Sequence, residues 1–377
     1  MNYKKGVLIA FGELFLKSKG VRKIFQRRLI NNLRFFLEKE GLNFKINNFR
    51  ERIFIALPAG RQETGQLLKA KKIIKRVFGI AWLAESFYFP EASLKEFSKF
   101  IDNNYQEWIK KNETFALRIK KERAIVDKIA KNINRRVDLT NPKKEIFIEN
   151  RGDGWFLYFK KIRGAGGLPN GSSGKVLCLV SGGIDSVPAA FLAAKRGAEN
   201  IWLHFHSFPL VSNFSIEKVK ELAKVYLKYQ PKLKIYFIPF QKNQLEIKAK
   251  TPANYRVLLY RRLMFQIAEN IALKENCQAL ITGESLGQVS SQTLTNIKII
   301  EEKIKTPVLR PLIGWDKEEI IDLAKEIGTY NISIKPQEDC CTLFVPKHQT
   351  AQGNLEVVEK LEKKLRLSGL DYDLYLI

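Results

Sequence analysis

The feature that most constrains the fold of this chain is the stretch VLCLVSGGIDSVPAAFLAAKRG, at residues 176–197. A short apolar run leads into a cluster of small polar residues, and a helical pattern follows that ends at Gly197. A buried strand joined to a helix by a glycine-containing turn is typical of an open parallel sheet, in which ligands bind at the carboxyl ends of the strands. The stretch therefore predicts an α/β domain with an anion-binding turn at residues 181–186.

The remainder of the second half supports this fold class. The apolar runs NIWLHF, LKIYFIPF and CQALIT alternate with helical patterns at residues 186–196, 215–229 and 255–274. Strands that alternate with helices indicate βαβ units, which build a doubly wound parallel sheet with helices on both faces. We expect this domain to span residues 176–377.

The first half shows a different, α+β pattern. In residues 21–40 the apolar side chains recur at helical spacing and leave a basic outer face, and the strand patterns GVLIAF and RIFIAL lie on either side. Strand and helix patterns recur up to residue 163 and end in a hairpin. Residues 164–175, GAGGLPNGSSGK, are rich in glycine and predict a linker. We therefore expect domains at 1–58 and 59–163, followed by that linker.

The charge of the chain points to a polyanionic partner. Lys and Arg number 65 against 39 Asp and Glu, which gives a formal net charge of +26. Such an excess favours nucleic acid as the partner, and a generally basic solvated surface is the alternative. The N-terminal sequence lacks the pattern of a signal peptide, and no apolar segment approaches 18 residues. We expect a soluble, cytoplasmic protein without a membrane partner.

The cysteines divide into two kinds. Cys178 and Cys277 lie in apolar runs and are expected to be small buried side chains. Cys340 and Cys341 are adjacent in the polar sequence PQEDCCT, which favours redox or sulfur-transfer chemistry. There is no CxxC pair, and the three histidines do not complete a ligand spacing, so neither a zinc site nor a secreted disulfide framework is expected.

The turn SGGIDS has the chemistry of a phosphate-binding loop. Gly182 and Gly183 lack a Cβ atom, so their backbone N–H groups could approach phosphate oxygens, and Ser181 and Ser186 add hydroxyl groups near a helix N-terminus. Asp185 would repel a phosphate unless Mg²⁺ bridges the two, or unless its carboxylate caps the helix. A capped turn without a ligand is the structural alternative. The sequence differs from a Walker A motif.

With these residues the chain resembles the PP-loop ATP pyrophosphatases. The match narrows with TGESLGQVSSQTL at 282–294, RPLIGWDKEEI at 310–320 and EDCCTLFVPKH at 338–348. Together with YRRLMFQIAE at 260–269, HFHS at 204–207 and GELFLKSKGVRKIF at 12–25, they are similar to the tRNA 4-thiouridine synthase family, also called tRNA sulfurtransferase. The resemblance covers nearly the whole chain.

The resemblance implies a fold, an activity and a set of site residues. It implies an N-terminal ferredoxin-like domain and a THUMP domain that bind tRNA. The PP-loop domain would use ATP and Mg²⁺ to adenylate the uridine at tRNA position 8, and sulfur from a persulfide donor, such as a cysteine desulfurase, would replace O4. Asp185 and Cys340 would be catalytic. The implied ATP-binding residues are Leu179, Val180, Ser181, Gly182, Gly183, Asp185, Ser186, His204, Phe205, Arg261, Gly283 and Gln292.

Several of these assignments have alternatives in the sequence itself. His204 could contact an adenine or ribose, or it could be a core histidine with its hydrogen bonds satisfied. Arg261 could neutralise a phosphate, or it could be solvated or bound to RNA. Gln292 could read an adenine edge or have no such role. The candidates for tRNA contacts are Arg118, Lys120 and Lys121, for which a solvated strand face is the alternative.

The chain also differs from the family pattern. Some members carry a C-terminal rhodanese-like extension and use it for sulfur supply to thiamine thiazole. This sequence stops at Ile377, so we expect sulfur to come directly from a cysteine desulfurase or another carrier, with Cys340 as the receiving or resolving thiol, and the thiamine role becomes doubtful. The THUMP region is shorter by about one helix, and Pro188 lies one residue later than usual, still within the first helical turn. Asp316 and Glu319 predict a capping box.

Two other functions fit parts of the sequence. A PP-loop enzyme could act on a small molecule or on another RNA site, although the basic first half argues against a small molecule. An RNA-binding protein with a silent nucleotide site is the second alternative, against which the intact SGGIDS and the cysteine pair argue. The sequence leaves open whether the protein forms a homo-oligomer.

Overall fold

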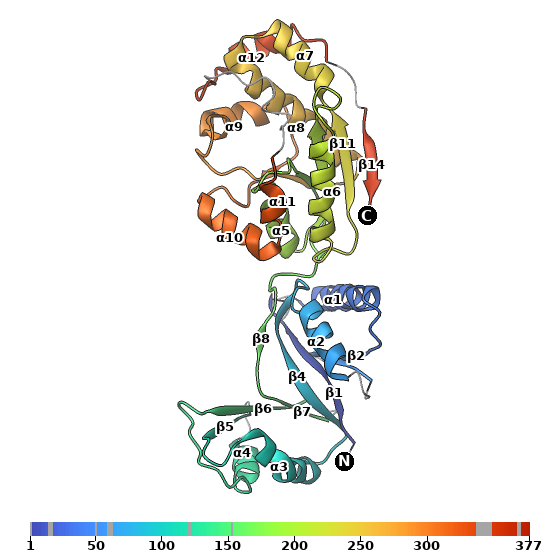
Figure 1. Cartoon of the computed structure of the whole chain (residues 1–377), viewed down its shortest axis with the longest axis vertical. Helices are drawn as coiled ribbons and strands as arrows, with labels where there is room; N and C mark the ends of the chain where they lie inside the picture. The colour runs from blue at the N-terminus through green and yellow to red at the C-terminus, as the bar shows by residue number, and fades with distance from the viewer. Residues whose placement is uncertain are drawn as a thin grey trace. The chain divides into compact units, whose positions relative to one another are not determined.

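The computed structural model describes residues 2–13, 18–49, 51–58, 63–119, 123–151, 154–336, 349–367 and 371–377 (Figure 1). It divides into two compact units, residues 1–169 and residues 170–377. The division falls inside the glycine-rich segment 164–175. No helix among the described residues has both the length and the apolar character that a membrane crossing requires.

The first unit is built on one mixed sheet. Its strands follow the order β2-β3-β1-β4-β7-β6-β5, with β8 paired to β4. The strands are β1 (Lys4–Phe11), β2 (Lys45–Asn48), β3 (Ile53–Ala56), β4 (Ile80–Pro90), β5 (Phe115–Ile119), β6 (Lys144–Asn150), β7 (Gly154–Tyr158) and β8 (Ile162–Arg163). The helices are α1 (Lys19–Lys39), α2 (Glu63–Ile74), α3 (Leu94–Trp108) and α4 (Arg123–Ala130).

The long strand β4 joins the two halves of this sheet. It pairs with β1 on one side and with β7 on the other, both antiparallel. Helices α1 and α2 pack their apolar side chains on β1, β3 and the start of β4, while α3 and α4 cover β5, β6 and β7. The expected domain boundary at residue 58 therefore falls within a single core, because α2 and β4 complete the packing of the strands that precede them.

The glycine-rich segment makes hydrogen bonds and packing contacts with each unit. On the first unit, the N–H of Gly164 donates to the Ala81 carbonyl, and Leu168 is buried in the core. On the second unit, the Asn170 side-chain amide donates to the Ala198 carbonyl at 2.8 Å, and the Ser173 N–H donates to the Gly197 carbonyl. The segment that we expected to be a linker from its glycine content is thus attached by hydrogen bonds on both sides of the division.

The second unit contains the predicted doubly wound sheet. Its strand order is β13-β12-β9-β10-β11-β14, and among the described strands β14 is antiparallel to its neighbour while the others pair in parallel. The strands are β9 (Lys175–Leu179), β10 (Glu199–His206), β11 (Lys234–Pro239), β12 (Ala279–Ile281), β13 (Val308–Leu309) and β14 (Asp373–Leu376).

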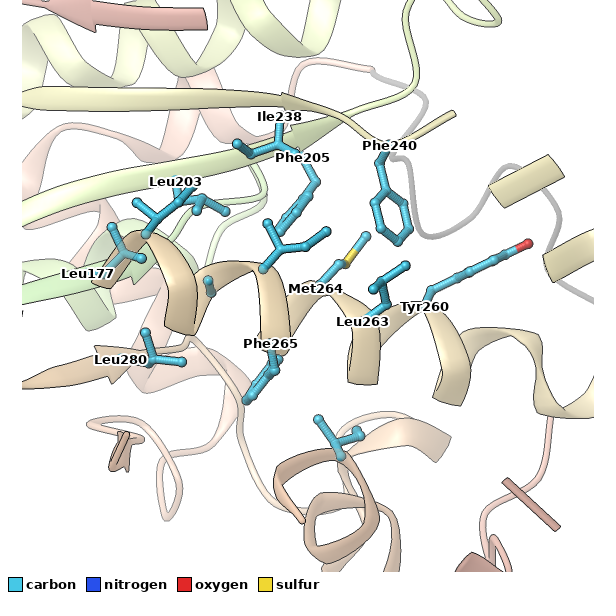
Figure 2. Close-up of a cluster of buried hydrophobic side chains, with 14 of the residues drawn as sticks. Leu177, Leu203, Phe205, Ile238, Phe240, Tyr260, Leu263, Met264, Phe265 and Leu280 are labelled. Atoms are coloured by element: carbon cyan, nitrogen blue, oxygen red, sulfur yellow. The ribbon is translucent and has the colours of Figure 1, made fainter. Parts of the chain in front are cut away.

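Helices cover both faces of this sheet. They are α5 (Ser186–Lys195), α6 (Phe214–Tyr226), α7 (Gln241–Lys250), α8 (Arg256–Lys274), α9 (Leu294–Glu301), α10 (Lys317–Ile327), α11 (Tyr330–Ser333) and α12 (Leu355–Glu362). Figure 2 shows the core on one face, where Met264 and Phe265 of α8 lie among Leu177, Leu203 and Leu280 of the strands. On the other face, Trp202 of β10 packs against Tyr226 of α6. The fold class predicted for this half is confirmed.

Candidate active site

A cavity of about 370 Å³ lies at the carboxyl ends of the parallel strands. Strand β10 pairs with one edge of β9, and β12, which comes later in the chain, pairs with the other edge of β9. A change of direction of this kind leaves a crevice beyond the strand ends, which is where open α/β sheets bind ligands. The cavity wall includes the segment after β9, residues of β10 and α8, and the segment after β12.

Most of the predicted ATP-binding residues line this cavity. All twelve are among the described residues, and nine of them contribute to its wall: Leu179, Val180, Ser181, Asp185, Ser186, Phe205, Arg261, Gly283 and Gln292. The other three, Gly182, Gly183 and His204, do not line it. Their assignment as ATP ligands, like that of the nine, stays a prediction.

The SGGIDS turn is held in a defined shape by its own residues. Gly182 has a φ of +85°, a conformation that L-residues with a side chain rarely adopt. The N–H of Gly183 donates to Ser181 Oγ at 3.2 Å. Ser186, the first residue of α5, is buried in the cavity wall, and its Oγ has no hydrogen-bond partner. The turn thus leaves a buried hydroxyl group available to a ligand at the start of a helix.

Gly283 makes room for this turn. A Cβ atom on Gly283 would lie 2.8 Å from the Asp185 carbonyl carbon and 2.9 Å from the Ser186 Cα. The close approach of two backbone segments explains why a glycine follows β12 at this point. That the backbone of Gly283 also approaches a ligand, as the sequence predicts, stays a prediction, and Gly283 does line the cavity.

Asp185 does not cap α5. It occupies the N-cap position, but its side chain makes no capping hydrogen bond. Instead its carboxylate forms an ion pair with Lys317, the first residue of α10, and accepts a hydrogen bond of 3.0 Å from Gln288 Nε2. The capping alternative for Asp185 is therefore wrong, and the carboxylate at the cavity wall is charge-paired. The predicted capping box of Asp316 and Glu319, directly beside Lys317, is confirmed.

The imidazole of His204 lies outside the cavity. Its Nδ1 is 2.8 Å from the Val180 carbonyl, to which it donates, and its Nε2 is 3.2 Å from Ser215 Oγ on α6. Burial lowers the pKa of His204 to about 4, so the ring is neutral at ordinary pH. The alternative of a satisfied core histidine describes this side chain, because β10 directs its neighbours Leu203 and Phe205 to the cavity instead.

Arg261 is held in the cavity wall by a network that the sequence did not reveal. It forms an ion pair with Glu284 and donates to Ser291 Oγ at 3.0 Å. Glu284 is buried and also accepts from Arg310 Nε at 2.7 Å and from Thr282 Oγ1 at 2.9 Å. Two guanidinium groups thus share one carboxylate, which removes the repulsion that a lone buried Glu284 would exert on an anionic ligand.

The cavity also contains unsatisfied hydrogen-bonding groups that suit a nucleotide. Gln292 is about nine-tenths buried, and its Oε1 has no hydrogen-bond partner. This acceptor fits the amino group of an adenine, and the Ser186 hydroxyl fits a phosphate oxygen. Among the described residues there is no group of three or more His, Cys, Asp or Glu side chains arranged to hold a metal ion.

The cysteine predictions have two different outcomes. Cys178 and Cys277 are buried, as predicted, and burial raises the pKa of both thiols, that of Cys277 to about 12. Cys340 and Cys341 lie in residues 337–348, outside the described residues. The described residues on either side are attached to the second unit: the Lys335 carbonyl accepts from the buried Lys218, and Gln349 lines the cavity.

The candidate tRNA contacts are only partly described. Arg118 forms an ion pair of 2.8 Å with Glu145 and donates to the Leu139 carbonyl, so it already has partners within its own unit. Lys120 and Lys121 lie outside the described residues. The structure thus gives Arg118 a structural role and does not test its contact with RNA.

The site contains more residues than the sequence analysis had assigned. Among the described residues, the additional polar side chains of the wall and their partners include Thr282, Glu284, Gln288, Ser291, Arg310, Lys317 and Gln349. Most of them lie in the quoted stretches at 282–294 and 310–320, so those stretches were the signal. A glycine-containing turn, guanidinium groups and unpaired buried hydrogen-bonding atoms at the switch point of a parallel sheet define a nucleotide-binding α/β domain.

Comparisons with known proteins agree with this class. Residues 171–367 match the family described as Thiamine biosynthesis protein (ThiI), and residues 6–84 match the ThiI ferredoxin-like domain. The chain therefore belongs to the ThiI family. It is 39% identical to a probable tRNA sulfurtransferase of Caldanaerobacter subterraneus, over 96% of each chain.

Solved structures show the same likeness over most or nearly all of the chain. A crystal structure of a 4-thiouridine synthetase–RNA complex with bound ATP matches with a TM-score of 0.84 at 32% identity, over 99% of this chain and all of that one. A protein from Pyrococcus horikoshii matches with a TM-score of 0.64 at 24% identity, over 86% of this chain and 99% of that one, and shares the fold. The ferredoxin-like match extends to residue 84, which agrees with the place of α2 and β4 in the first core.

Proposed function

We propose that this chain is an ATP-dependent tRNA sulfurtransferase that converts the uridine at tRNA position 8 to 4-thiouridine. The observation that carries the proposal is the cavity at the switch point, where the SGGIDS turn, Arg261 and the unpaired oxygen atoms of Ser186 and Gln292 meet. Relatives named tRNA sulfurtransferase and the RNA-bound and ATP-bound 4-thiouridine synthetase support it.

In the first step ATP activates the uracil. The turn and the N-terminus of α5 would hold the phosphates, and Arg261 would offset their charge. Uridine O4 attacks the α-phosphorus, and pyrophosphate leaves. Asp185 places a carboxylate in the cavity wall, a hard oxygen ligand of the kind that Mg²⁺ prefers, and Mg²⁺ held there would neutralise the leaving pyrophosphate. Lys317 and Gln288, its present partners, keep this carboxylate at the rim of the cavity.

In the second step sulfur replaces the activated oxygen. The terminal sulfur of a persulfide attacks C4 of the adenylated uracil, and AMP leaves with O4. A second thiolate then attacks the inner sulfur of the adduct, so that the S–S bond breaks, a disulfide forms and the outer sulfur stays on C4 as 4-thiouridine. We assign the sulfur-transfer step to Cys340, which would act with a persulfide donor such as a cysteine desulfurase. The assignment is supported by Gln349, which lines the cavity and follows the cysteine pair closely in the sequence. The buried Cys178 and Cys277 are unsuited to the step, since their pKa values are raised.

Recognition of tRNA belongs to the first unit in this proposal. Residues 1–169 contain 37 Lys and Arg against 17 Asp and Glu, while residues 170–377 contain 28 against 22. The excess positive charge is thus concentrated outside the nucleotide-binding unit, where a phosphate backbone could be bound. We propose that the ferredoxin-like part and a THUMP domain within residues 59–163 form this RNA-binding surface.

Pyrophosphate release by the full chain tests the proposal. We expect release from ATP that depends on tRNA, together with near-ultraviolet absorption of 4-thiouridine when a desulfurase and cysteine are added. Release with a transcript that carries cytidine at position 8 would instead favour an enzyme that modifies another RNA site. RNA binding without any release would favour an RNA-binding protein with a silent nucleotide site.

Paired cysteine variants test the sulfur step. Cys340→Ser should abolish 4-thiouridine formation while tRNA-dependent pyrophosphate release continues, because adenylation requires no thiol. Cys341→Ser is the matched control for a change at the neighbouring position. Normal thiolation by Cys340→Ser in the presence of desulfurase would refute the assignment of Cys340.

A further inference from the structure

Gln349 is a wall residue of the cavity that no sequence motif pointed to. It is the first described residue after residues 337–348, and it lines the cavity together with Ser291 and Gln292. Its Oε1 accepts a hydrogen bond of 2.9 Å from Ser290 Oγ. With the amide oxygen turned to Ser290, the amide nitrogen offers N–H donors, which complement the phosphate, ribose and ring-nitrogen acceptors of a nucleotide.

Asn296 fixes the segment that carries Gln349. Its side chain is almost fully buried and makes three hydrogen bonds. Nδ2 donates to the Ser290 carbonyl at 2.8 Å and to the Thr350 carbonyl at 2.9 Å, and Oδ1 accepts from the Gly353 N–H at 2.9 Å. One amide therefore joins the loop that holds Gln292 to the segment that begins at Gln349.

Other contacts fix the same segment in one position. Thr293 Oγ1 donates to the Ala351 carbonyl at 2.8 Å, and the Thr350 N–H donates to the Asn254 carbonyl. Gly353 fits tightly, because a Cβ atom there would lie 2.7 Å from Leu258 on α8. Hydrogen bonds and close packing thus fix the part of the cavity wall that contains Gln349.

We propose that Gln349 is a further nucleotide-binding residue, and that Asn296 is the positioning residue that places its amide group against the nucleotide. The inference rests on the proposed function, since it takes ATP as the occupant of the cavity. It adds to the predicted ATP residues one that comes from the segment following the cysteine pair.

Equilibrium binding of ATP to the full chain tests the proposal. Gln349→Ala should weaken ATP binding about 3- to 10-fold, the effect of losing one hydrogen bond, with the Tm of the nucleotide-free protein unchanged. In tRNA-dependent pyrophosphate release, the KM for ATP should rise by the same factor while kcat is kept. An affinity equal to that of the wild type would overturn the role of Gln349.

A double-mutant cycle tests the positioning role. Asn296→Ala should weaken ATP binding at least as much as Gln349→Ala, and the double variant should be no weaker than Asn296→Ala alone. Additive losses in the double variant would overturn the positioning role. Asn354→Ala is the matched control, because Asn354 caps α12 without lining the cavity: it should lower the Tm and leave ATP affinity unchanged.

These outcomes separate the inference from the proposed function. If the wild-type chain binds ATP and Gln349→Ala weakens that binding, the inference holds even where tRNA thiolation fails, and only the proposed function is lost. If thiolation proceeds and both variants bind ATP normally, the proposed function holds and the inference is refuted.

Discussion

At the scale of single residues, Asp185 is the side chain on which the proposed adenylation depends most directly. Its carboxylate lies in the cavity wall and makes no helix cap, so its removal should affect chemistry more than folding. We predict that Asp185→Asn lowers tRNA-dependent pyrophosphate release on the order of 10²-fold, because the amide is a poor Mg²⁺ ligand, with little change in Tm.

The control for this prediction is Asp322→Asn on α10. Asp322 is exposed and forms an ion pair with Lys325, away from the cavity. The variant makes the same chemical change and should keep pyrophosphate release at the wild-type rate. Pyrophosphate release by Asp185→Asn at the same rate as by Asp322→Asn would show that Asp185 is not catalytic.

His204 gives the fold a defined pH dependence. Its pKa falls from about 6.5 in the unfolded chain to about 4 in the folded one, mainly because burial disfavours the charged ring. The unfolded state therefore binds the proton more readily. The contribution to stability is complete above pH 6.5 and is lost as the pH falls towards 4, by up to about 3 kcal/mol.

We predict that His204→Asn reduces this loss of stability. Urea unfolding at pH 7.5 and pH 5 should show a smaller difference in the free energy of unfolding for the variant than for the wild type. His206, whose pKa burial also lowers, should account for part of the dependence that remains. An unchanged pH dependence in His204→Asn would contradict the assignment to His204.

The site residues divide according to what a sequence can show. The SGGIDS turn was predictable because a strand, a turn and a helix follow one another, so local pattern places Ser181 and Ser186 at a strand end. Lys317 was not, because it meets Asp185 across 132 residues of sequence. Glu284 lay within a recognised motif, but its pairing with Arg310 depends on how β12 and β13 lie side by side.

At the scale of elements, the junction of β12 with the start of α5 sets the shape of the site. We predict that Gly283→Ala lowers stability by about 1–3 kcal/mol and weakens ATP binding, because the new Cβ would press on the backbone at Asp185. The measurements are thermal unfolding and ATP affinity. Gly314→Ala, where nothing lies within 4 Å of the added Cβ, should change neither, and equal effects of the two would refute the close-approach argument.

Element patterns predicted most of the helices and strands, but not how strands pair. The apolar pattern IAWLAESFYF at residues 80–89 predicts a strand, and the structure shows β4 at Ile80–Pro90. The sequence did not show that β4 pairs with both β1 and β7. Because of this pairing, the strands of the two expected domains belong to one sheet. Pairing between strands about 70 residues apart leaves no periodic trace in either strand, so a boundary at residue 58 was a natural expectation.

At the scale of the whole molecule, the excess of positive charge is larger in the first unit than in the second. Helix α1 of the first unit contributes exposed Lys and Arg side chains to it. Lys23, Arg27 and Arg34 are exposed at positions that fall on one face of this helix. Replacing these three by Gln should raise the KM for tRNA and leave ATP affinity unchanged. The salt dependence of tRNA binding should also become shallower, by up to about 0.9 in log–log slope for each phosphate group that the variant no longer neutralises.

The matched control removes three exposed cations from the second unit instead. Lys224, Lys228 and Lys363 are exposed on the nucleotide-binding unit, and their replacement by Gln changes the net charge by the same amount. If tRNA is bound through specific phosphate contacts on the first unit, this control should keep nearly the wild-type KM and salt slope. If net charge alone attracts tRNA, the two triple variants should behave alike, and the assignment of recognition to residues 1–169 fails.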